Sequence, residues 1–230
     1  MASCGLGSRR GVEQLVLEGK VQVNKVTVTE LSFDVNEEND TVTVNGKKVV
    51  PTAKFSYVLF NKPKGCVCSE NDDRERKTVY DYLNGIPSGL HLVGRLDYDT
   101  EGLLILTNDG DLNFRLTHPS NEIEKTYLVK TEGELTQEDL ARLKKGIKTK
   151  EGITYGKSRI KFLRKEEKLF VYEVTISEGK NREIRKMMEE VGKNVAFLKR
   201  VSIGQLRLGG LSRGGWRFLT EDEVYYLKNL

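Results

Sequence analysis

The stretch of sequence that decides the fold reads Gly-Arg-Leu-Asp-Tyr-Asp-Thr-Glu-Gly-Leu-Leu, from Gly94 to Leu104. Short apolar runs lie on either side of it, at residues 91–93 and 103–106, which predicts two strands joined by a loop. Within the loop, Arg95 comes two residues before Asp97. A nearby guanidinium keeps a carboxylate ionised, which is the arrangement that a nucleophilic or basic aspartate needs. The loop is therefore the first candidate for a chemical site.

Spacing alone allows two other interpretations of this loop. Acids at alternate positions before a glycine, here Asp97, Asp99 and Glu101, are typical of a calcium-binding loop. The twelfth position is Asn108, however, where such a loop carries a bidentate glutamate, and the flanks are predicted strands rather than helices. A tight turn with solvated acids also fits the spacing, because Asp and Gly are common in turns.

The charge of the chain is unevenly distributed along its 230 residues, although the net charge is only +4. Residues 1–50 carry 6 basic and 7 acidic side chains, and residues 51–120 carry 8 and 10. Residues 121–230 carry 24 basic and 17 acidic side chains. The positive excess of this last segment favours an anionic partner, nucleic acid first.

The composition excludes several classes of protein. No run approaches the roughly 18 apolar residues of a membrane helix, and the first residues lack the basic and apolar segments of a secretory signal. Three cysteines are an odd number, and Cys66 and Cys68 are too close for an ordinary disulfide, which favours a reducing, cytoplasmic setting. His91 and His118 are too few and too separate for a histidine-rich metal site, and we expect them and Trp216 to be structural.

Residues 8–49 have the pattern of a small αβ unit. Ser8 is expected to cap a helix with Val12, Leu15 and Val16 on one face, and Gly19 to end it. Two strands are expected at Val21–Val23 and Thr41–Val44. Each is followed by a turn, at Asn24-Lys25 and at Asn45-Gly46. Polar residues around Pro51 then read as a linker, and a more apolar region begins at Phe55.

The region from residue 55 onward is predicted to be α+β, with a mainly antiparallel mixed sheet, because strands outnumber helices of crossover length. Apolar residues alternate in 125–130, 157–163 and 170–176, as in strands. Thr136 with Asp139 and Thr220 with Glu223 are capping boxes that begin helices. The remaining predictions are a turn at Asn108-Asp109-Gly110 and a helix capped by Asn181, with the apolar stripe Ile184, Met187, Met188 and Val191.

The segment Gly94–Gly110 resembles the catalytic-aspartate motif of RNA pseudouridine synthases, in the RsuA/RluB branch that modifies ribosomal RNA. Phe60–Gly65 is similar to the start of that branch's catalytic domain, Glu124–Val129 to the segment with its active-site tyrosine, and Glu178–Met187 to its third motif. Residues 198–204 and 206–219 complete the pattern. The similar segments follow the family's order over residues 57–220.

The N-terminal residues 4–49 resemble the small RNA-binding domain first seen in a small-subunit ribosomal protein. Gly5–Arg10 is similar to its helix start and Gly19–Asn24 to its turn. That domain normally has an additional helix before this segment, and we expect the module here to lack it. The predicted organisation is a small RNA-binding module at 1–49, a linker at 50–54 and a catalytic domain with a central RNA-binding cleft at 55–230.

The resemblance implies that a specific uridine of ribosomal RNA, of the large subunit rather than the small, is isomerised to pseudouridine. Asp97 would be the nucleophile, acting at C1′ or C6 of the uridine or removing a proton. Arg185 would pair with Asp97, with Arg95 as the second candidate or as a contact to the flipped nucleotide. Tyr127 would stack on the uracil, and Leu198 would contact its other side. The reaction has no redox change, so neither a cofactor nor a metal is expected.

Basic side chains are expected to hold the RNA, mostly within residues 180–217, which carry 10 basic and 3 acidic side chains. The predicted contacts are Arg9, Arg10, Lys20, Lys25, Lys180, Arg182, Lys186, Lys199 and Arg200. We expect a monomer whose partner is ribosomal RNA or a pre-ribosomal particle, with no membrane involved. The alternative function is a non-catalytic RNA-binding or ribosome-assembly factor that uses the same basic surface.

Overall fold

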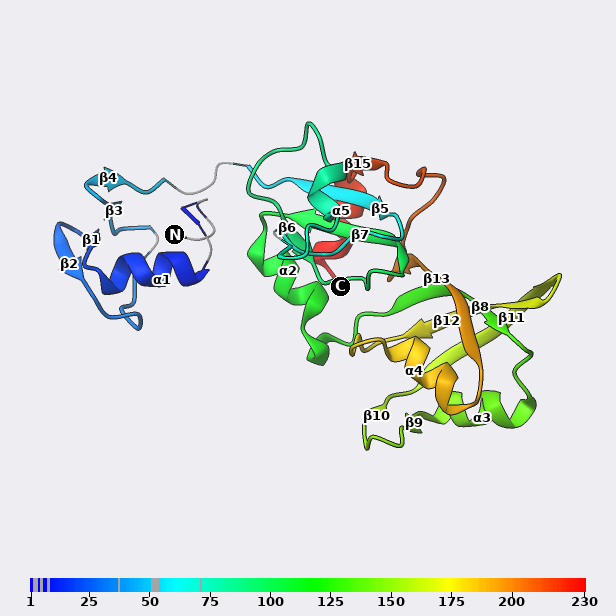
Figure 1. The fold of residues 1–230 in the computed structure, drawn as a ribbon. Coiled ribbons are helices and arrows are strands. Elements are labelled where there is room, and N and C mark those ends of the chain that lie inside the picture. The colour runs from blue at the N-terminus through cyan, green and yellow to red at the C-terminus, as the bar shows by residue number, and fades with distance from the viewer. Residues whose placement is uncertain (2–3, 5, 8, 37, 51–53, 71) are drawn as a thin grey trace. The chain divides into compact units, whose positions relative to one another are not determined.

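The computed structural model describes residues 1, 4, 6–7, 9–36, 38–50, 54–70 and 72–230. The contacts between residues divide the chain into two units, Met1–Phe55 and Ser56–Leu230 (Figure 1). The predicted cap Ser8 and residues 51–53 of the predicted linker lie outside the described residues. In the described part, no helix combines the length and the apolar character needed to cross a bilayer.

The first unit is a helix packed against a small antiparallel sheet of strand order β2-β1-β3-β4. Valines from both layers form its core, because α1 places Val16 among the buried valines of the strands. Gly19 has a φ of +67° and ends α1, as predicted, and Asn45-Gly46 forms the predicted hairpin turn. The elements are α1 (Arg9–Leu17), β1 (Val21–Val23), β2 (Val26–Val28), β3 (Val42–Val44) and β4 (Lys47–Lys48).

The second unit is built on one mixed, mainly antiparallel sheet, which confirms the predicted fold class. Its strands follow the order β11-β12-β8-β13-β7-β5-β15, with β14 beside β13 and β6 beside β7. These strands are β5 (Tyr57–Lys62), β6 (His91–Val93), β7 (Glu101–Thr107), β8 (Lys125–Glu132), β11 (Ser158–Glu166), β12 (Leu169–Ile176), β13 (Asn194–Ile203), β14 (Leu206–Arg207) and β15 (Trp216–Phe218).

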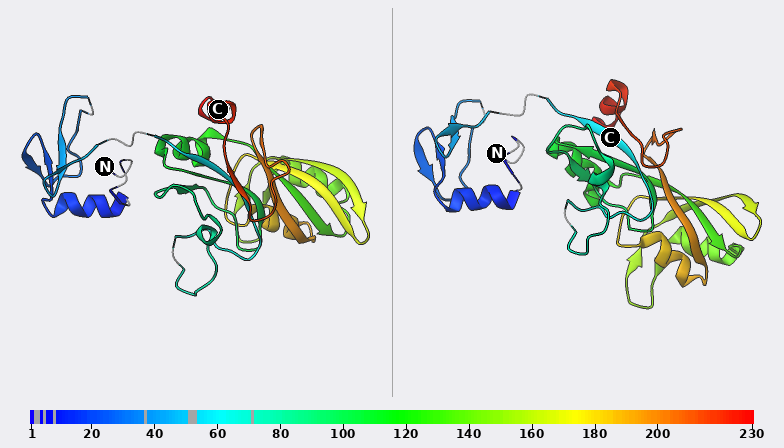
Figure 2. Two further views of the ribbon diagram at one scale, coloured as in Figure 1. Left: turned by 90° about the horizontal axis from the view of Figure 1, so that it is seen from above. Right: turned by 45° about the horizontal axis from the view of Figure 1, so that its top comes forward.

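Helices and short elements cover this sheet, and the two views of Figure 2 show α4 against the half that contains β8, β12 and β13. The α-helices are α2 (Gly110–Thr117), α3 (Gln137–Lys145), α4 (Glu183–Glu190) and α5 (Glu221–Lys228). The short elements are the 3-10 turns η2 (Val79–Tyr82) and η3 (Pro119–Asn121) and the separate pair β9 (Ile147–Lys148) and β10 (Thr154–Tyr155).

Strand β7 is buried along its whole length, which explains its unbroken apolar run. Leu103 and Ile105 face a cluster that includes α2 and α5. Leu104 and Leu106 face the opposite cluster, which includes residues of β5 and η2. Because successive side chains of a strand point to opposite faces, covering both faces favours apolar residues at consecutive positions, as at Leu103–Leu106. This rigid strand carries the loop that contains Asp97.

The two halves of the sheet join where β7 meets β13 in a short parallel pairing, at Lys199↔Glu101 and Arg200↔Gly102. Gly102 has a φ of +110°, and a Cβ atom at this position would lie 2.1 Å from the carbonyl oxygen of Arg200. Arg200 also donates from Nε to the carbonyl oxygen of Leu103 at 2.7 Å. The junction thus depends on the absence of a side chain at residue 102.

Two of the predicted helix starts are correct and two predictions are wrong. The capping boxes of Thr136 and Thr220 are both formed. The predicted turn at Asn108-Asp109-Gly110 is instead the beginning of α2, because the Asp109 carboxylate accepts from the amide of Leu112 and caps the helix. Asn181 is not the cap of α4; Arg182 is, in a left-handed conformation and without a side-chain cap.

We predict that Gly102→Ala destabilises the second unit by about 3 to 5 kcal/mol, because the added methyl group must displace the backbone of β13. Urea-induced unfolding measures this change. Gly110→Ala is the matched control: nothing lies within 4 Å of a Cβ there, and the position is helical, so its stability should change by less than about 1 kcal/mol. Equal stabilities for the two variants would contradict the role of Gly102 at the junction.

Candidate active site

The candidate nucleophile Asp97 lies in the turn between β6 and β7. Its carbonyl oxygen accepts from the amide of Thr100 at 3.1 Å. The preceding Leu96 is buried in the core cluster of the other half of the sheet, and its amide donates to Sγ of Cys68. Among the described residues, the half-buried carboxylate of Asp97 has no hydrogen bond or ion pair. The loop backbone is therefore held firmly while the carboxylate stays available to a substrate.

Lys62 holds this loop through hydrogen bonds from its side chain to the loop backbone. Its side chain is fully buried, and its Nζ donates to the carbonyl oxygens of Pro63, Asp97 and Thr100 at 3.1, 3.0 and 2.9 Å. Burial lowers the pKa of the Lys62 ammonium, and the charges of nearby Asp97 and Asp99 oppose that shift. Three carbonyl acceptors satisfy all three N–H groups, which makes the burial of this cation possible.

We predict that Lys62→Met destabilises the second unit by about 2 to 4 kcal/mol, since three buried carbonyl groups lose a charged donor. Thermal and urea unfolding measure the loss. Lys64→Met is the control, because Lys64 lies on the same segment but is exposed, and a surface change of this kind stays within about 0.5 kcal/mol. A Lys62→Met variant as stable as the control would show that the ammonium does not hold the loop.

Arg185 reaches the loop from α4, but its ion-pair partner is Asp99 rather than the predicted Asp97. Its Nη2 lies 3.2 Å from Oδ2 of Asp99 and donates to the Asp99 carbonyl oxygen at 3.0 Å, while Nη1 donates to the Val195 carbonyl oxygen. Arg182 lies 3.3 Å from the other carboxylate oxygen of Asp99. Burial lowers the pKa of Arg185, and Asp99 opposes this more than Asp97 does. Both arginines near the turn therefore form their ion pairs with Asp99.

Tyr127 and Leu198, the two predicted contacts to the uracil, lie on neighbouring strands β8 and β13. Their side chains are 8% and 5% exposed and belong to one cluster, which also contains Leu96. The register pairs Leu198 with Val129 and Tyr127 with Arg200. Tyr127 and Leu198 thus belong to the same core cluster as Leu96, the residue that precedes Asp97. Arg95, the second candidate for pairing with Asp97, is exposed, and no ion pair links it to a described residue.

Two buried charged side chains, Glu183 of α4 and Arg200 of β13, and the half-buried Lys125 of β8 lie in this half of the second unit. Burial raises the pKa of Glu183 to about 7. Burial lowers the pKa of Lys125 to about 8, and the positive charge of Arg200 lowers it further in the same direction. The Glu183 carboxylate accepts from the amide of Lys180 at 2.9 Å. Arg200, one of the predicted RNA contacts, is only 5% exposed, so its guanidinium does not lie on the open surface of the described fold. Its strand lies between β8 and β7 in the sheet, and its Nε donates to the carbonyl oxygen of Leu103 on β7.

We predict that Glu183→Gln stabilises the protein above pH 7 by about 1 to 3 kcal/mol. Because the folded-state pKa of Glu183 is raised, the folded protein holds this proton more tightly than the unfolded chain. That stabilisation is full below about pH 4.5 and is lost as the pH rises through about 7. A glutamine keeps an acceptor for Lys180 without a charge. Urea unfolding at pH 5 and pH 8 measures the difference, with exposed Glu189→Gln as the control; a less stable Glu183→Gln variant at pH 8 would contradict the prediction.

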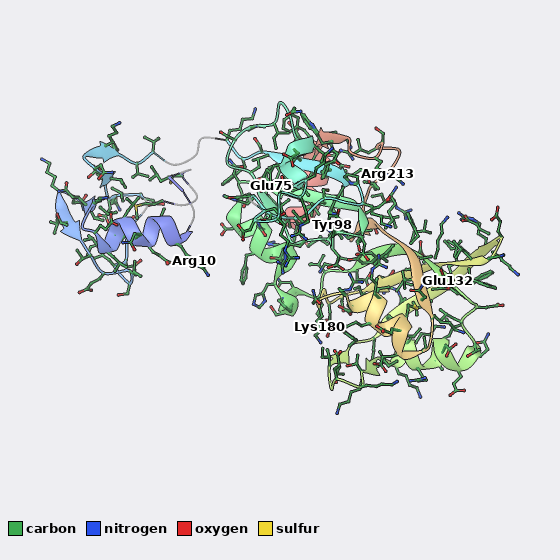
Figure 3. All side chains as sticks on the ribbon, viewed as in Figure 1. Arg10, Glu75, Tyr98, Glu132, Lys180 and Arg213 are labelled. Carbon is green, nitrogen blue, oxygen red and sulfur yellow. The ribbon has the colours of Figure 1, made fainter. Side chains whose placement is uncertain are left out.

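Three other predicted RNA contacts of the second unit lie at or near α4. Lys180 pairs with Glu178, Arg182 with Asp99 and Lys186 with Glu151. Lys199 is half-buried on β13. Exposed pairs of this kind contribute little to stability, so these cations can exchange a carboxylate for a phosphate. Figure 3 labels Lys180 just before α4 and Tyr98, the exposed aromatic side chain of the Asp97 loop.

In the first unit, Arg10, Lys20 and Lys25 are exposed, and Lys20 pairs with Glu18. Arg9 begins α1, and its side chain is outside the description.

The calcium interpretation of the loop is not supported by the geometry. Glu101 is buried in β7 and pairs with Arg213 at 3.1 Å, and Asp99 pairs with two arginines. Within the described ranges, no cluster of three or more His, Cys, Asp or Glu side chains is arranged to hold a metal ion.

Sequence reasoning did not assign roles to Lys62 and Asp99. The sequence does contain a signal for Lys62. This lysine comes directly after Asn61 and the apolar run Val58–Phe60, where a strand is expected to be buried, so its own burial could have been predicted. Asp99 was considered as an acid of the loop, but nothing in the sequence indicates that two residues some 85 positions later reach it. Such contacts between distant segments become visible only in the folded chain.

Two family models match the chain. One, described as RNA pseudouridylate synthase, matches residues 56–190, and the S4 domain matches residues 1–42.

Individual proteins are similar over nearly the whole chain. The ribosomal large subunit pseudouridine synthase B of Bacillus subtilis (strain 168) is 42% identical, over 100% of this chain and 94% of its own length. A protein of Aquifex aeolicus (strain VF5), named as an uncharacterized RNA pseudouridine synthase, is 41% identical over 99% of this chain and 91% of its own. A solved pseudouridylate synthase structure superimposes with a TM-score of 0.71 at 30% identity, covering 98% of this chain and 95% of that one.

Proposed function

The chain belongs to the RNA pseudouridylate synthase family, and on that basis we propose that it isomerises a specific uridine of large-subunit ribosomal RNA to pseudouridine. The choice of RNA rests on the relatives named as synthases of the large ribosomal subunit. The single observation that carries the proposal within this chain is the turn at Asp97. There a carboxylate without a partner among the described residues lies on a loop whose backbone is bonded to a buried ammonium.

Asp97 is proposed as the nucleophile. The isomerisation breaks the N1–C1′ bond, rotates the uracil and forms a C5–C1′ bond, and the proton on C5 leaves while N1 gains one. Atoms and electrons balance without an oxidant or reductant. The carboxylate acts at C1′ or C6 of the nucleotide, for which it must be ionised and able to move toward the substrate. Arg185 and Arg182 pair with Asp99, so the Asp97 carboxylate has no ion-pair partner among the described residues.

The uracil must leave its stack to reach Asp97, and Tyr127 and Leu198 are proposed to receive it. A flipped base is held between aromatic and apolar side chains, and these two residues share one cluster with Leu96 of the loop. Both side chains are nearly buried, with exposed fractions of 8% and 5%. The same contacts would orient the uracil while it turns.

RNA binding is proposed to involve both units. Residues 1–49 would form the small RNA-binding module, 50–54 the linker and 55–230 the catalytic domain. The segment around α4, with Lys180, Arg182 and Lys186, would contact phosphates, helped by Lys199. We further propose a monomer that acts in the cytoplasm on ribosomal RNA or a pre-ribosomal particle, in keeping with the free cysteines Cys4, Cys66 and Cys68.

We predict that Asp97→Asn lowers the rate of pseudouridine formation by about 10³-fold or more, because removing a nucleophile abolishes its step while binding remains. The measurement is tritium release from large-subunit ribosomal RNA that contains [5-³H]uridine. RNA affinity, measured in parallel by filter binding, should stay within about twofold.

The control for this experiment is Asp111→Asn, which removes an exposed acid on α2 and should keep full activity. Wild-type protein that releases no more tritium than Asp97→Asn would refute the enzymatic function. RNA binding by such an inactive protein would then support the alternative, a non-catalytic ribosome-assembly factor.

A further inference from the structure

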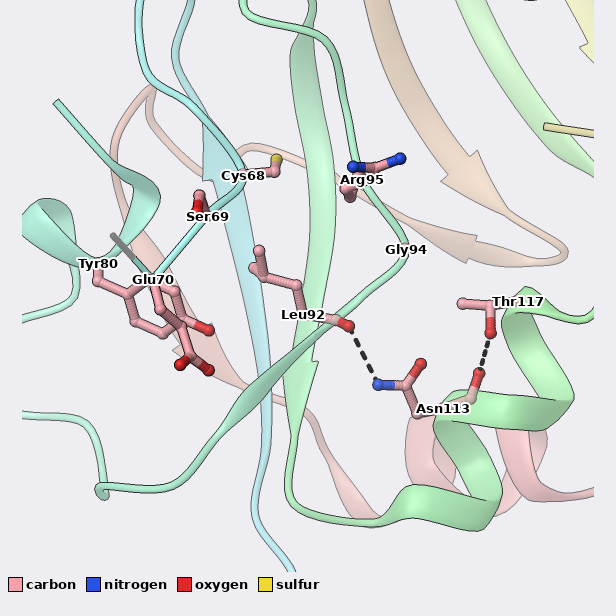
Figure 4. A pocket seen from close by; sticks show the side chains of 9 residues that line it. All are labelled: Cys68, Ser69, Glu70, Tyr80, Leu92, Gly94, Arg95, Asn113 and Thr117. Carbon is pink, nitrogen blue, oxygen red and sulfur yellow. Dashed lines mark hydrogen bonds between the residues drawn. The ribbon is translucent and has the colours of Figure 1, made fainter. Parts of the chain in front are cut away.

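A pocket of about 350 Å³ adjoins the Asp97 loop on the side of β6 and α2 (Figure 4). Its lining includes Cys68, Tyr80, Leu92, Arg95, Asn113 and Thr117. Arg95 is two residues before Asp97 in the chain, so the pocket begins beside the proposed nucleophile. Its volume lies at the lower end of the range of small-molecule sites, which suits one planar group rather than a large ligand. The proposed chemistry at Asp97 does not involve this pocket.

The walls of the pocket combine apolar surface with one fixed amide. Leu92, Cys68 and the ring of Tyr80 supply the apolar part, and the Tyr80 hydroxyl is held by the carbonyl oxygen of Leu90. Asn113 donates from Nδ2 to the carbonyl oxygen of Leu92 at 3.0 Å, as Figure 4 shows. This bond sets the orientation of the carboxamide and leaves it a second N–H and an oxygen. A donor and an acceptor side by side match the edge of a nucleobase.

The charge at the pocket is positive on the side of the loop. Arg95 is exposed, and no carboxylate among the described residues pairs with it. On the other rim, Glu70 lies 3.2 Å from Nδ1 of His91. Arg95 and Tyr80 lie on opposite sides of the pocket, with Leu92 between them (Figure 4), so a base that enters between these walls can have its phosphate at the Arg95 guanidinium.

We propose that this pocket receives the base of a second, unpaired nucleotide of the RNA, near the target uridine. Asn113 contacts the edge of the base, Thr117 borders it, and Arg95 binds its phosphate. The pocket would then select the RNA by a nucleotide that undergoes no chemistry. This inference rests on the proposed function, because it concerns the same RNA substrate.

The test uses two variants in the full chain. Asn113→Ala removes the amide. Thr117→Val replaces the hydroxyl, which donates to the Asn113 carbonyl oxygen at 2.7 Å, by a methyl group of similar size and keeps the bond from Asn113 to Leu92. Tritium release from a large-subunit ribosomal RNA fragment gives kcat/KM for each, with Asp111→Asn as the control on the same helix. We expect Asn113→Ala to lower kcat/KM about tenfold or more, mainly through KM, and Thr117→Val to lower it by a smaller factor. Thermal unfolding of both variants monitors the fold.

A scan of the RNA identifies the occupant. Each nucleotide near the target is replaced in turn by an abasic one, and the wild-type protein and Asn113→Ala are compared on every RNA. At one position, the abasic substitution should lower kcat/KM of the wild-type protein. The same substitution should have little further effect on Asn113→Ala, because that variant already lacks the contact from Asn113 to the base.

The results separate this inference from the function beneath it. Folded variants within twofold of the wild type, or abasic effects that are equal in both proteins at every position, would overturn the pocket proposal while the enzymatic function stands. A wild-type protein no more active than Asp97→Asn would refute the function, and the pocket proposal with it.

Discussion

The architecture of the second unit depends on the close approach of Gly102 to the backbone of Arg200. Each half of the sheet is antiparallel and held by long ladders, but the halves meet through two parallel residue pairs. At that junction the two backbones approach more closely than any side chain at residue 102 would allow. The Asp97 loop ends at this position, so the same constraint that joins the halves also places the loop against Tyr127 and Leu198 on the other half.

Local sequence signals were sufficient for much of the fold. The capping boxes at Thr136 and Thr220, the turn at Asn45-Gly46 and the alternation in residues 170–176 are each decided by neighbours in the chain, and each is formed. Asp109 was misinterpreted because aspartate before glycine is equally suited to a turn and to a helix cap. Asn181 failed for a different reason: the carboxylate of Glu183 binds the amide of Lys180, and Arg182 adopts the cap position.

The site itself was less accessible to sequence reasoning. The resemblance proposes roles for Asp97, Tyr127 and Leu198, but the partners of Asp99, Lys62 and Arg200 are set by segments far apart in the chain. A basic residue among other basic residues is expected to be exposed. Arg200 is buried, however, because β13 lies between β8 and β7 and the Arg200 guanidinium donates to a carbonyl oxygen of β7. The sign of a charge can be read from sequence, whereas its burial follows from topology.

The buried ammonium of Lys62 has a consequence for ionic strength. Contacts between exposed cations and RNA phosphates weaken steeply as salt is added, because released counterions drive them. The bonds from Lys62 to the loop lie away from solvent and are screened far less. Salt therefore acts on the capture of the RNA and leaves the shape of the loop at Asp97 intact. With the proposed RNA contacts, the protein would combine salt-sensitive binding with a loop at Asp97 whose shape depends little on salt.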